Sequence, residues 1–234
     1  MNDLYSTHYG WLLATGRTDY KRALAWQHSL VKMRREGIAR DTILILEHPP
    51  VITVGRDGHD ANYSECKLEP VFIERGGDVT YHGPGQLVAY FIFNLTRHGR
   101  DLHKFMENLQ QGIVDAFAEI GITAAIREGD HRGVWVEDKK IASVGVAVKN
   151  WITFHGVATN LNTDLKDFLQ INPCGLESDV MTSASQQLGK DVDLDRFSQI
   201  LVEQYARLFV TEFEPVELEE LDEVLESQSG GYEI

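Results

Sequence analysis

The sequence contains little cysteine, and this scarcity excludes one way of holding a fold together. Only two cysteines, Cys66 and Cys174, occur in 234 residues, and two cannot form the disulfide framework of a small secreted domain. Neither has a cysteine or histidine at the short spacing of a zinc site, so we expect no metal ion. Residues 1–5 lack the basic and apolar blocks of a signal peptide. Together these absences indicate a protein of the reducing cytoplasm.

Basic residues and long apolar runs are also scarce. The 22 lysines and arginines are outnumbered by 36 acidic residues, which gives a formal net charge of −14, whereas a nucleic-acid-binding protein needs a basic surface. No apolar run approaches the roughly 18–20 residues that span a membrane. We therefore expect neither a nucleic acid nor a membrane as partner. A hydrophobic fraction of 43% is still enough for the core of a globular domain.

The negative charge is concentrated near the end of the sequence. Residues 211–234 contain nine acidic residues and no lysine or arginine, which leaves a net charge of only −5 for the other 210 residues. Residues 17–40 carry a local charge of +5, to which Arg34 and Arg35 contribute. We predict a main domain over 1–213 and an acidic helical extension over 214–234. The basic region is a candidate docking face for acidic partner proteins.

The spacing of apolar residues predicts both helices and strands. Helices are expected over 19–36 and after the capping residue Asp101, the second closed by Gly121. Runs of β-branched and aromatic residues predict strands over 42–46, 51–54, 71–73, 87–93, 122–126, 133–137, 140–148 and 151–159. The last third is expected to be helical, over 183–189, 194–211 and 217–227. The pattern favours an α/β (α+β) domain in which helices flank a mixed sheet.

Residues 75–87 form the most unusual segment of the sequence. They include four glycines and a proline just before the predicted strand over 87–93. Glycine lets a ligand approach the backbone closely and permits positive φ angles. A plain hairpin connection is the alternative, and the segment matches neither a Walker loop nor a GxGxxG motif.

Two further positions stand out by their neighbours. Lys139 and Lys140 are adjacent, so on a strand their side chains point to opposite faces, and one of them would face inward; two solvated turn lysines are the alternative. Cys174 lies in a turn-like segment between a proline and a glycine, whereas cysteines of a core usually lie among aliphatic residues. Cys66 lies in a polar loop with no comparable surroundings, and we interpret it as incidental.

Five stretches, in order along the chain, resemble the lipoyl(octanoyl) transferases: residues 46–56, 75–87, 140–145, 154–156 and 172–175. That family moves an octanoyl or lipoyl group from acyl carrier protein to a lysine of a lipoyl domain, the first step of endogenous protein lipoylation. The resemblance implies an acyltransferase of lipoate biosynthesis, with no cofactor and with a catalytic domain like that of the lipoate and biotin protein ligases. It implies octanoyl-acyl carrier protein as donor. The implied acceptors are the lipoyl domains of 2-oxoacid dehydrogenases and the glycine cleavage H protein.

The resemblance also assigns roles to residues. Cys174 is implied to carry the acyl group as a thioester, and Lys140, 34 residues earlier, to lower the pKa of its thiol, as a nearby cation does. The acyl pocket is implied to be lined by Arg75, Gly76, Gly77, Asp78, Val79, Thr80, Tyr81, His82, Ser143, Val144, Gly145, Gly156, Val157 and Ala158, with His155 as a further candidate. The oxyanion needs N–H donors, either near Cys174 or in the Gly76–Gly77 loop. The acidic stretch after about residue 211 lies outside the resemblance.

Three other functions stay open from the sequence. An ATP-dependent lipoate or biotin protein ligase would share the fold but activate a free acid without a cysteine. A non-catalytic acyl- or carrier-binding protein would keep the pocket and form no covalent adduct. An amidotransferase would move octanoyl between two lipoyl-type domains by the same chemistry. An octanoyl adduct formed from carrier protein without ATP separates the first two from the predicted transferase, and the choice of donor separates the third.

Overall fold

A mixed β-sheet of eight strands forms the centre of the computed structural model, which describes residues 8–172 and 180–217. The strand order is β11-β1-β2-β6-β10-β9-β8-β7. These strands are β1 (His8–Arg17), β2 (Asp41–Glu47), β6 (Gln86–Ile92), β7 (Ala125–Arg127), β8 (Gly133–Val136), β9 (Lys139–Lys149), β10 (Ile152–Asn160) and β11 (Thr211–Pro215). β1 pairs in parallel with β2 and β11, and the other neighbours are antiparallel. The predicted mixed sheet is therefore confirmed.

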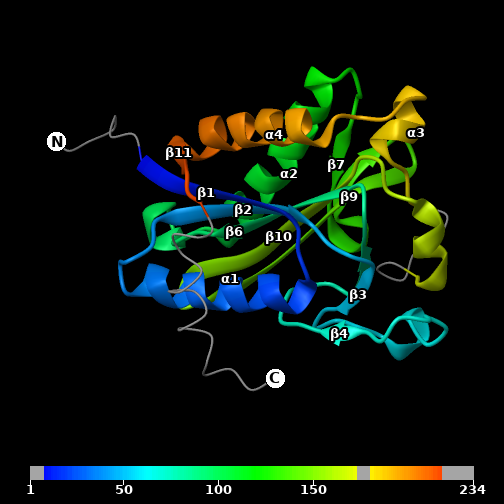
Figure 1. The fold of residues 1–234 in the computed structure, drawn as a ribbon, viewed down its shortest axis with the longest axis horizontal. Coiled ribbons are helices and arrows are strands. Elements are labelled where there is room, and N and C mark those ends of the chain that lie inside the picture. The colour runs from blue at the N-terminus through cyan, green and yellow to red at the C-terminus, as the bar shows by residue number, and fades with distance from the viewer. Residues whose placement is uncertain (1–7, 173–179, 218–234) are drawn as a thin grey trace.

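A small three-stranded sheet packs beside the large one, with strand order β4-β3-β5. Its strands are β3 (Val51–Val54), β4 (Val71–Phe72) and β5 (Val79–His82). It shares a separate apolar cluster with the 3₁₀ helix η4 (Leu165–Gln170), in which Ile52, Tyr81 and Phe168 are buried. Figure 1 shows this sheet on the same side of the large sheet as the first helix.

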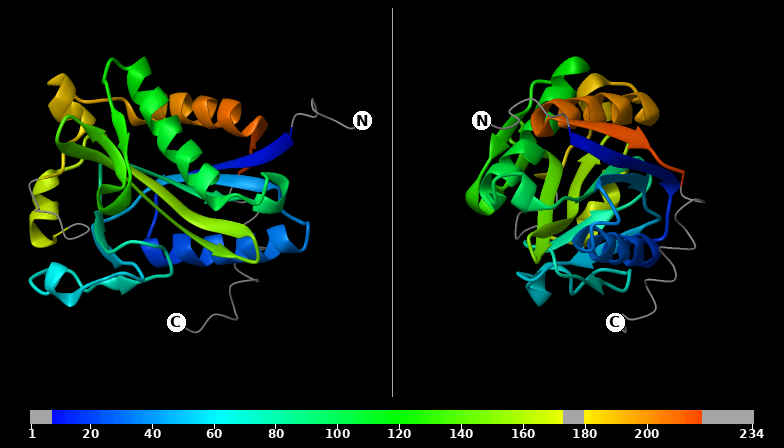
Figure 2. Two further views of the ribbon diagram at one scale, coloured as in Figure 1. Left: turned by 180° about the vertical axis from the view of Figure 1, so that it is seen from behind. Right: turned by 90° about the vertical axis from the view of Figure 1, so that its left-hand side faces the viewer.

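Helices cover both faces of the large sheet (Figures 1 and 2). α1 (Tyr20–Arg35) lies on one face, and α2 (Leu102–Glu119) and α4 (Leu194–Phe209) lie together on the other. The shorter helices are α3 (Ala184–Leu188) and the 3₁₀ turns η1 (Asp60–Asn62), η2 (Leu95–Arg97) and η3 (Gly129–His131). Alternate residues of β6 enter the two cores, Phe91 toward α2 and α4 and Tyr90 toward α1. This alternation follows from the two-residue period of a strand.

The helix ends follow the predicted capping residues. Asp19 accepts a hydrogen bond from the N–H of Arg22 at 3.1 Å, and Asp101 accepts one from the N–H of Lys104 at 2.9 Å. Gly121 has a φ of +82° just beyond α2, the left-handed conformation that ends many helices. Both predicted helices therefore begin and end within about two residues of the observed bounds.

Three strands are absent from the sequence prediction. β1 contains two glycines, β5 lies inside the glycine-rich segment, and β11 is rich in glutamate. Backbone pairing with neighbouring strands stabilises all three, and local composition carries no signal for such pairing. β11 also crosses the predicted domain boundary after residue 213, and the helix predicted over 217–227 lies, apart from residue 217, outside the described residues. The division into domain and extension stays a prediction.

The structure corrects the expectation for Arg34. Its side chain is buried, and Nε donates to Asp41 Oδ1 at 2.6 Å. Asp41 Oδ2 accepts from His98 Nε2 at 2.8 Å, and Asp41 Oδ1 also accepts from the N–H of Asn94 at 2.8 Å. We call these four residues the Asp41 cluster. Arg34 holds α1 to β2 and is not part of a docking face, which leaves exposed residues such as Arg22 and Arg35 to supply its charge.

The described residues contain neither a helix suited to crossing a membrane nor a group of side chains suited to holding a metal ion. None of their helices combines the length and apolar character that crossing a membrane requires. Their histidine, cysteine, aspartate and glutamate side chains form no group of three that would hold a metal ion.

Candidate active site

A cavity of about 910 Å³ opens beside β9 and β10. Almost all the pocket residues predicted from the sequence line it: Arg75, Gly76, Gly77, Asp78, Val79, Thr80, His82, Lys140, Ser143, Val144, Gly145, His155, Gly156, Val157 and Ala158. Tyr81 does not, because its phenol donates to Asp167 Oδ2 at 2.6 Å and its ring packs on Phe168. The volume lies in the range of sites that bind small molecules.

Hydrogen bonds fix the glycine-rich loop at one side of this cavity. Gly76 donates its N–H to Val146 O at 3.2 Å, and Gly77, with a φ of +83°, donates its N–H to Asp57 Oδ2 at 2.7 Å. Both N–H groups are thus already used within the protein. The Gly76–Gly77 loop is therefore a poor source of donors for an oxyanion, which leaves the backbone near Cys174 as the other option from the sequence.

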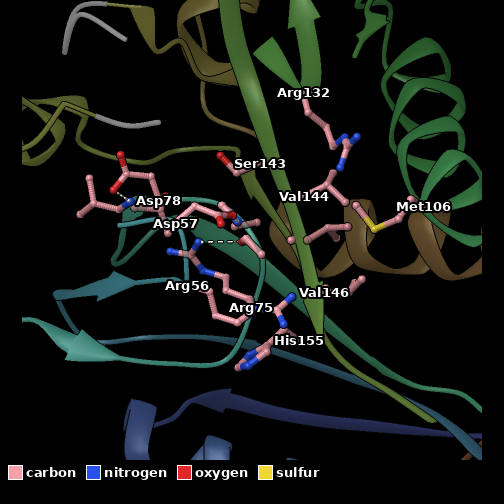
Figure 3. Close-up of a pocket in the computed structure, with 18 of the residues that line it drawn as sticks. Arg56, Asp57, Arg75, Asp78, Met106, Arg132, Ser143, Val144, Val146 and His155 are labelled. Carbon is pink, nitrogen blue, oxygen red and sulfur yellow. Dashed lines mark hydrogen bonds between the residues drawn. The ribbon is translucent and has the colours of Figure 1, made fainter. Parts of the chain in front are cut away.

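Arg75 begins this loop with a buried guanidinium group. Its Nη2 donates to Thr53 O at 2.9 Å and to Thr53 Oγ1 at 3.0 Å. Figure 3 shows Arg75 close to Asp57 and His155 in the cavity, with Met106 of α2 reaching toward Val144 of β9. The cavity thus combines charged groups on the loop with apolar side chains from α2 and β9.

Lys140 is buried in the cavity wall, with 2% of its surface exposed, whereas its neighbour Lys139 is exposed. This is the inward-facing lysine that strand geometry predicted. Gly133 on the adjoining strand makes room for it, because a Cβ atom there would lie 2.6 Å from Lys140 Cε. The carbonyl of Lys140 accepts the N–H of Thr182 at 2.9 Å, and Lys140 forms a parallel bridge with Met181. The chain therefore returns to Lys140 at residues 181–182.

The structure describes the surroundings of only one of the two cysteines, Cys66. Cys174 lies outside the described residues, which end at Asn172 and resume at Val180. At the last described residue before Cys174, the N–H of Asn172 donates to Asn62 O at 2.8 Å. Cys66 is half-buried, with its Sγ donating to Leu68 O at 3.1 Å, and it is not among the cavity-lining residues.

Buried histidines and tyrosines form the polar part of the cavity. Of these, Tyr20 and Tyr90 were not predicted as site residues, and both line it. His48 lies behind them: its Nδ1 donates to Thr18 O and its Nε2 accepts from the Tyr90 hydroxyl, both at 2.7 Å. Burial lowers the pKa of His48 to about 4. These histidines and tyrosines come from strands and a helix far apart in the sequence, so no local motif marks them as one site.

His155 occupies a strained position. It has a φ of +60°, which is uncommon for a residue with a side chain, and its N–H donates to Gln27 Oε1 at 2.8 Å. His155 Nε2 lies 3.7 Å from Glu74 Oε2, and burial outweighs the effect of this carboxylate and lowers the pKa of the imidazole. Backbone strain of this kind is common at functional sites. Here the left-handed backbone conformation of His155 places its ring at the cavity wall.

The other lining residues that the sequence did not reveal come from several elements, among them Val88 of β6 and Val146 of β9. Arg56, Asp57 and His59 follow β3, and Leu102, His103 and Met106 come from the start of α2, with Gly129 and Arg132 beyond it. Leu102 is an apolar residue of that helix, yet its side chain is exposed at the cavity. Helical periodicity identifies an apolar face, but it does not tell whether that face meets the core or a cavity.

Comparisons with known proteins agree with this geometry. The family model of the lipoyl protein ligase A/B catalytic domain matches residues 19–206. An octanoyltransferase of Geobacter metallireducens is 44% identical over 179 residues, which cover 76% of this chain and 84% of that protein. An octanoyltransferase of Thermosynechococcus vestitus is 42% identical over 217 residues, covering 91% and 95%.

Solved structures confirm the predicted fold. Lipoate-protein ligase A bound with ATP has a TM-score of 0.75 at 14% identity, with 95% of each chain covered. A biotin protein ligase from Aquifex aeolicus in complex with biotin and ATP has a TM-score of 0.54 at 16% identity, covering 86% of this chain and 71% of that one. Together with the sequence matches, these findings place the chain in the lipoyl protein ligase A/B catalytic domain family, and within that family it belongs with the octanoyltransferases.

Proposed function

We propose that this chain transfers an octanoyl or lipoyl group from acyl carrier protein to a lysine of a lipoyl domain, through a thioester on Cys174. The observation that carries the proposal is the buried amine-bearing side chain of Lys140 in the wall of a cavity large enough for an acyl chain. Membership of the octanoyltransferase family supplies the acyl group and the general kind of acceptor. The acceptors in this proposal are the lipoyl domains of 2-oxoacid dehydrogenases and the glycine cleavage H protein.

The first half-reaction loads the enzyme. The thiolate of Cys174 attacks the carbonyl carbon of the donor thioester, a new C–S bond forms, and the donor C–S bond breaks. The departing thiolate takes a proton from the Lys140 ammonium. A buried cation beside a thiol favours the thiolate, which is the reactive form. The apolar residues Val144, Val157 and Ala158 of the cavity wall suit the hydrocarbon tail.

The second half-reaction passes the acyl group on. The neutral amine of the acceptor lysine attacks the acyl carbon, a C–N bond forms, and the C–S bond to Cys174 breaks, which restores the thiolate. The nitrogen gives its extra proton to the neutral Lys140 amine, and the enzyme returns to its starting state. Because an amide is more stable than a thioester, the reaction runs forward without ATP.

The proposal is tested by mass spectrometry of the intact protein. Incubation with octanoyl-acyl carrier protein, without ATP, should give an adduct that hydroxylamine removes. The adduct should be absent from Cys174→Ala and present in the matched control Cys66→Ala, because Cys66 does not line the cavity. Full transfer by Cys174→Ala would overturn the covalent mechanism. Transfer that requires free octanoate and ATP would instead identify a ligase.

A further inference from the structure

Buried hydrogen bonds connect the cavity to the strand that carries Lys140. His82 Nδ1 lies 2.7 Å from Gln86 Oε1, and Gln86 Nε2 donates to Asn160 Oδ1 at 3.0 Å. Asn160 Nδ2 donates to the carbonyl of Thr182 at 3.1 Å, and the N–H of Thr182 donates to the carbonyl of Lys140 at 2.9 Å. None of the five residues is more than 6% exposed. We call His82, Gln86, Asn160 and Thr182 the amide relay.

Two backbone carbonyls fix the orientation of both amides. Gln86 Nε2 also donates to the carbonyl of Tyr81 at 3.2 Å, and Asn160 Nδ2 donates to that of Thr182. A carbonyl only accepts hydrogen bonds, so these side-chain atoms are nitrogens, and Gln86 Oε1 faces His82. His82 Nδ1 must therefore carry the proton, which leaves a lone pair on Nε2. The relay thus selects one tautomer of His82.

The lone pair of His82 is available to a ligand. His82 lines the cavity, and none of the described residues donates a hydrogen bond to Nε2. Burial, and then the neighbouring His48, lowers the pKa of His82 to about 3. The titratable and charged groups facing the ring are Tyr20 of α1, His48 after β2, Arg75 of the glycine-rich loop and His155 of β10. At neutral pH the ring is uncharged, and Nε2 acts only as an acceptor.

We propose that Gln86 and Asn160 are positioning residues that hold His82 as the Nδ1–H tautomer, so that Nε2 accepts an N–H of the acceptor lysine's amine. The inference rests on the proposed function, since that amine is its second substrate. An acceptor that holds one N–H restricts the direction of the nitrogen lone pair and orients it toward the acyl carbon. His82 takes no proton in this scheme. The relay ends at the backbone carbonyl of Lys140. The same two amides therefore position His82 Nε2 relative to the strand that carries Lys140, whose amine receives the proton.

The decisive variant is Gln86→Glu, which keeps the size of the side chain. One oxygen of the new side chain accepts from His82 Nδ1, and the other replaces the nitrogen that donates to Tyr81 O and Asn160 Oδ1, so those two acceptors lose their donor. The ionised carboxylate raises the pKa of the imidazole, as a neighbouring negative charge does. The imidazolium then presents a donor at Nε2 instead of an acceptor. Acylation of Cys174 should stay within about twofold of the wild type, while transfer to the acceptor amine should fall about tenfold at pH 6, the value of one hydrogen bond in a transition state. Transfer should recover as the pH rises, whereas the wild type should show no such step.

Nitrogen-15 spectra of the histidines give a second readout in the wild-type protein, for which one variant serves only to assign the signals. In the wild type, His82, assigned with His82→Gln, should be the neutral Nδ1–H tautomer from pH 5 to 8. The control is Gln204→Glu, a buried glutamine on α4 that does not line the cavity, and it should keep the wild-type pH profile of transfer.

The outcomes separate this inference from the proposed function. An Nε2–H tautomer of His82 in the wild type would overturn the role of the relay. So would a wild-type pH profile of transfer in a folded Gln86→Glu protein whose nitrogen-15 spectra show the imidazolium form of His82 at pH 6. Acylation lost together with transfer in Gln86→Glu would also overturn it, because the relay is assigned to the second half-reaction alone. A wild-type enzyme that forms no acyl adduct would contradict the proposed function instead, and the tautomer measurement would still stand by itself.

Discussion

Two buried polar clusters in this protein are built in opposite ways. The Asp41 cluster is charged: Arg34 and Asp41 meet at 2.6 Å, and His98 and the N–H of Asn94 complete the hydrogen bonds of the carboxylate. Burial alone would raise the pKa of Asp41, but these hydrogen bonds outweigh it and hold the pKa below its usual value. None of its four residues lines the cavity.

The amide relay is buried more completely, since Asn94 and His98 of the Asp41 cluster are only half-buried, and it is made of uncharged groups. It reaches the cavity through His82, whose pKa burial lowers to about 3. The difference indicates that the two clusters have different roles. The charged cluster holds α1 to the sheet, whereas the neutral relay orients groups at the cavity without placing a further charge there. Changes in the first should therefore affect stability, and changes at the cavity should affect activity.

The largest expected effect belongs to Lys140. Lys140→Met keeps most of the side-chain length and removes the ammonium, so kcat/KM for octanoyl transfer should fall by about 10²- to 10⁴-fold, the usual range for loss of a group that moves protons. The pH dependence of iodoacetamide alkylation should show a higher pKa for the Cys174 thiol. Thermal melts should check that the variant folds.

The neighbouring lysine provides the control for this experiment. Lys139→Met removes the same charge from the exposed face of the strand, and activity should stay within about twofold of the wild type, as for most surface changes. If Lys140→Met lowered the melting temperature strongly and left transfer intact, the proposed division between the two regions would be wrong.

The second effect concerns stability and tests the charged side of the comparison. Asp41→Asn leaves the guanidinium of Arg34 buried without its carboxylate, and breaking a buried pair in this way costs about 3–5 kcal/mol. Urea unfolding at neutral pH should show this loss, while kcat under folding conditions should stay near the wild-type value. The matched control is Asp138→Asn, whose ion pair with Arg127 involves a 95% exposed side chain, so its change should be under about 1 kcal/mol. Equal losses in both variants would contradict the assignment.

The sequence revealed much of the cavity and little of the Asp41 cluster, for a physical reason. Glycines in a row and adjacent lysines are local signals that single out residues 75–87 and Lys140, and the resemblance adds 143–145 and 156–158. Apart from Tyr81, the structure brings the predicted pocket residues and Lys140 to one cavity. Arg34 and Asp41 lie only seven residues apart, but the first was interpreted as a surface charge because helical position alone does not show which neighbour covers it.

The relay was missed for the same reason. Gln86, Asn160 and Thr182 belong to a strand, another strand and a loop, and each looks like an ordinary polar residue in the sequence. Gln86 and Asn160 become neighbours because β6 pairs with β10, and Thr182 joins them because the chain returns to Lys140 at residues 181–182. Such contacts are set by strand order, and a single sequence predicts the strands better than their order.

The smallest expected effect, a change of slope, appears in the pH dependence of stability. The pKa of His48 is lowered from 6.5 to about 4 in the folded protein, so below pH 6.5 the unfolded chain binds a proton that the folded one does not. Stability should therefore rise with pH between about 4 and 6.5, by up to about 1.4 kcal/mol per pH unit from this residue. The contribution of Asp41, with an ordinary pKa of 3.8, disappears only below that window, so the contributions of His48 and Asp41 separate along the pH axis. His48→Gln should flatten the slope in urea unfolding between pH 4.5 and 6.5, and the exposed His103→Gln should not. If the slope were unchanged in His48→Gln, this histidine would be charged in the folded protein. The conclusion that the buried histidines beside the cavity are uncharged would then be wrong for His48.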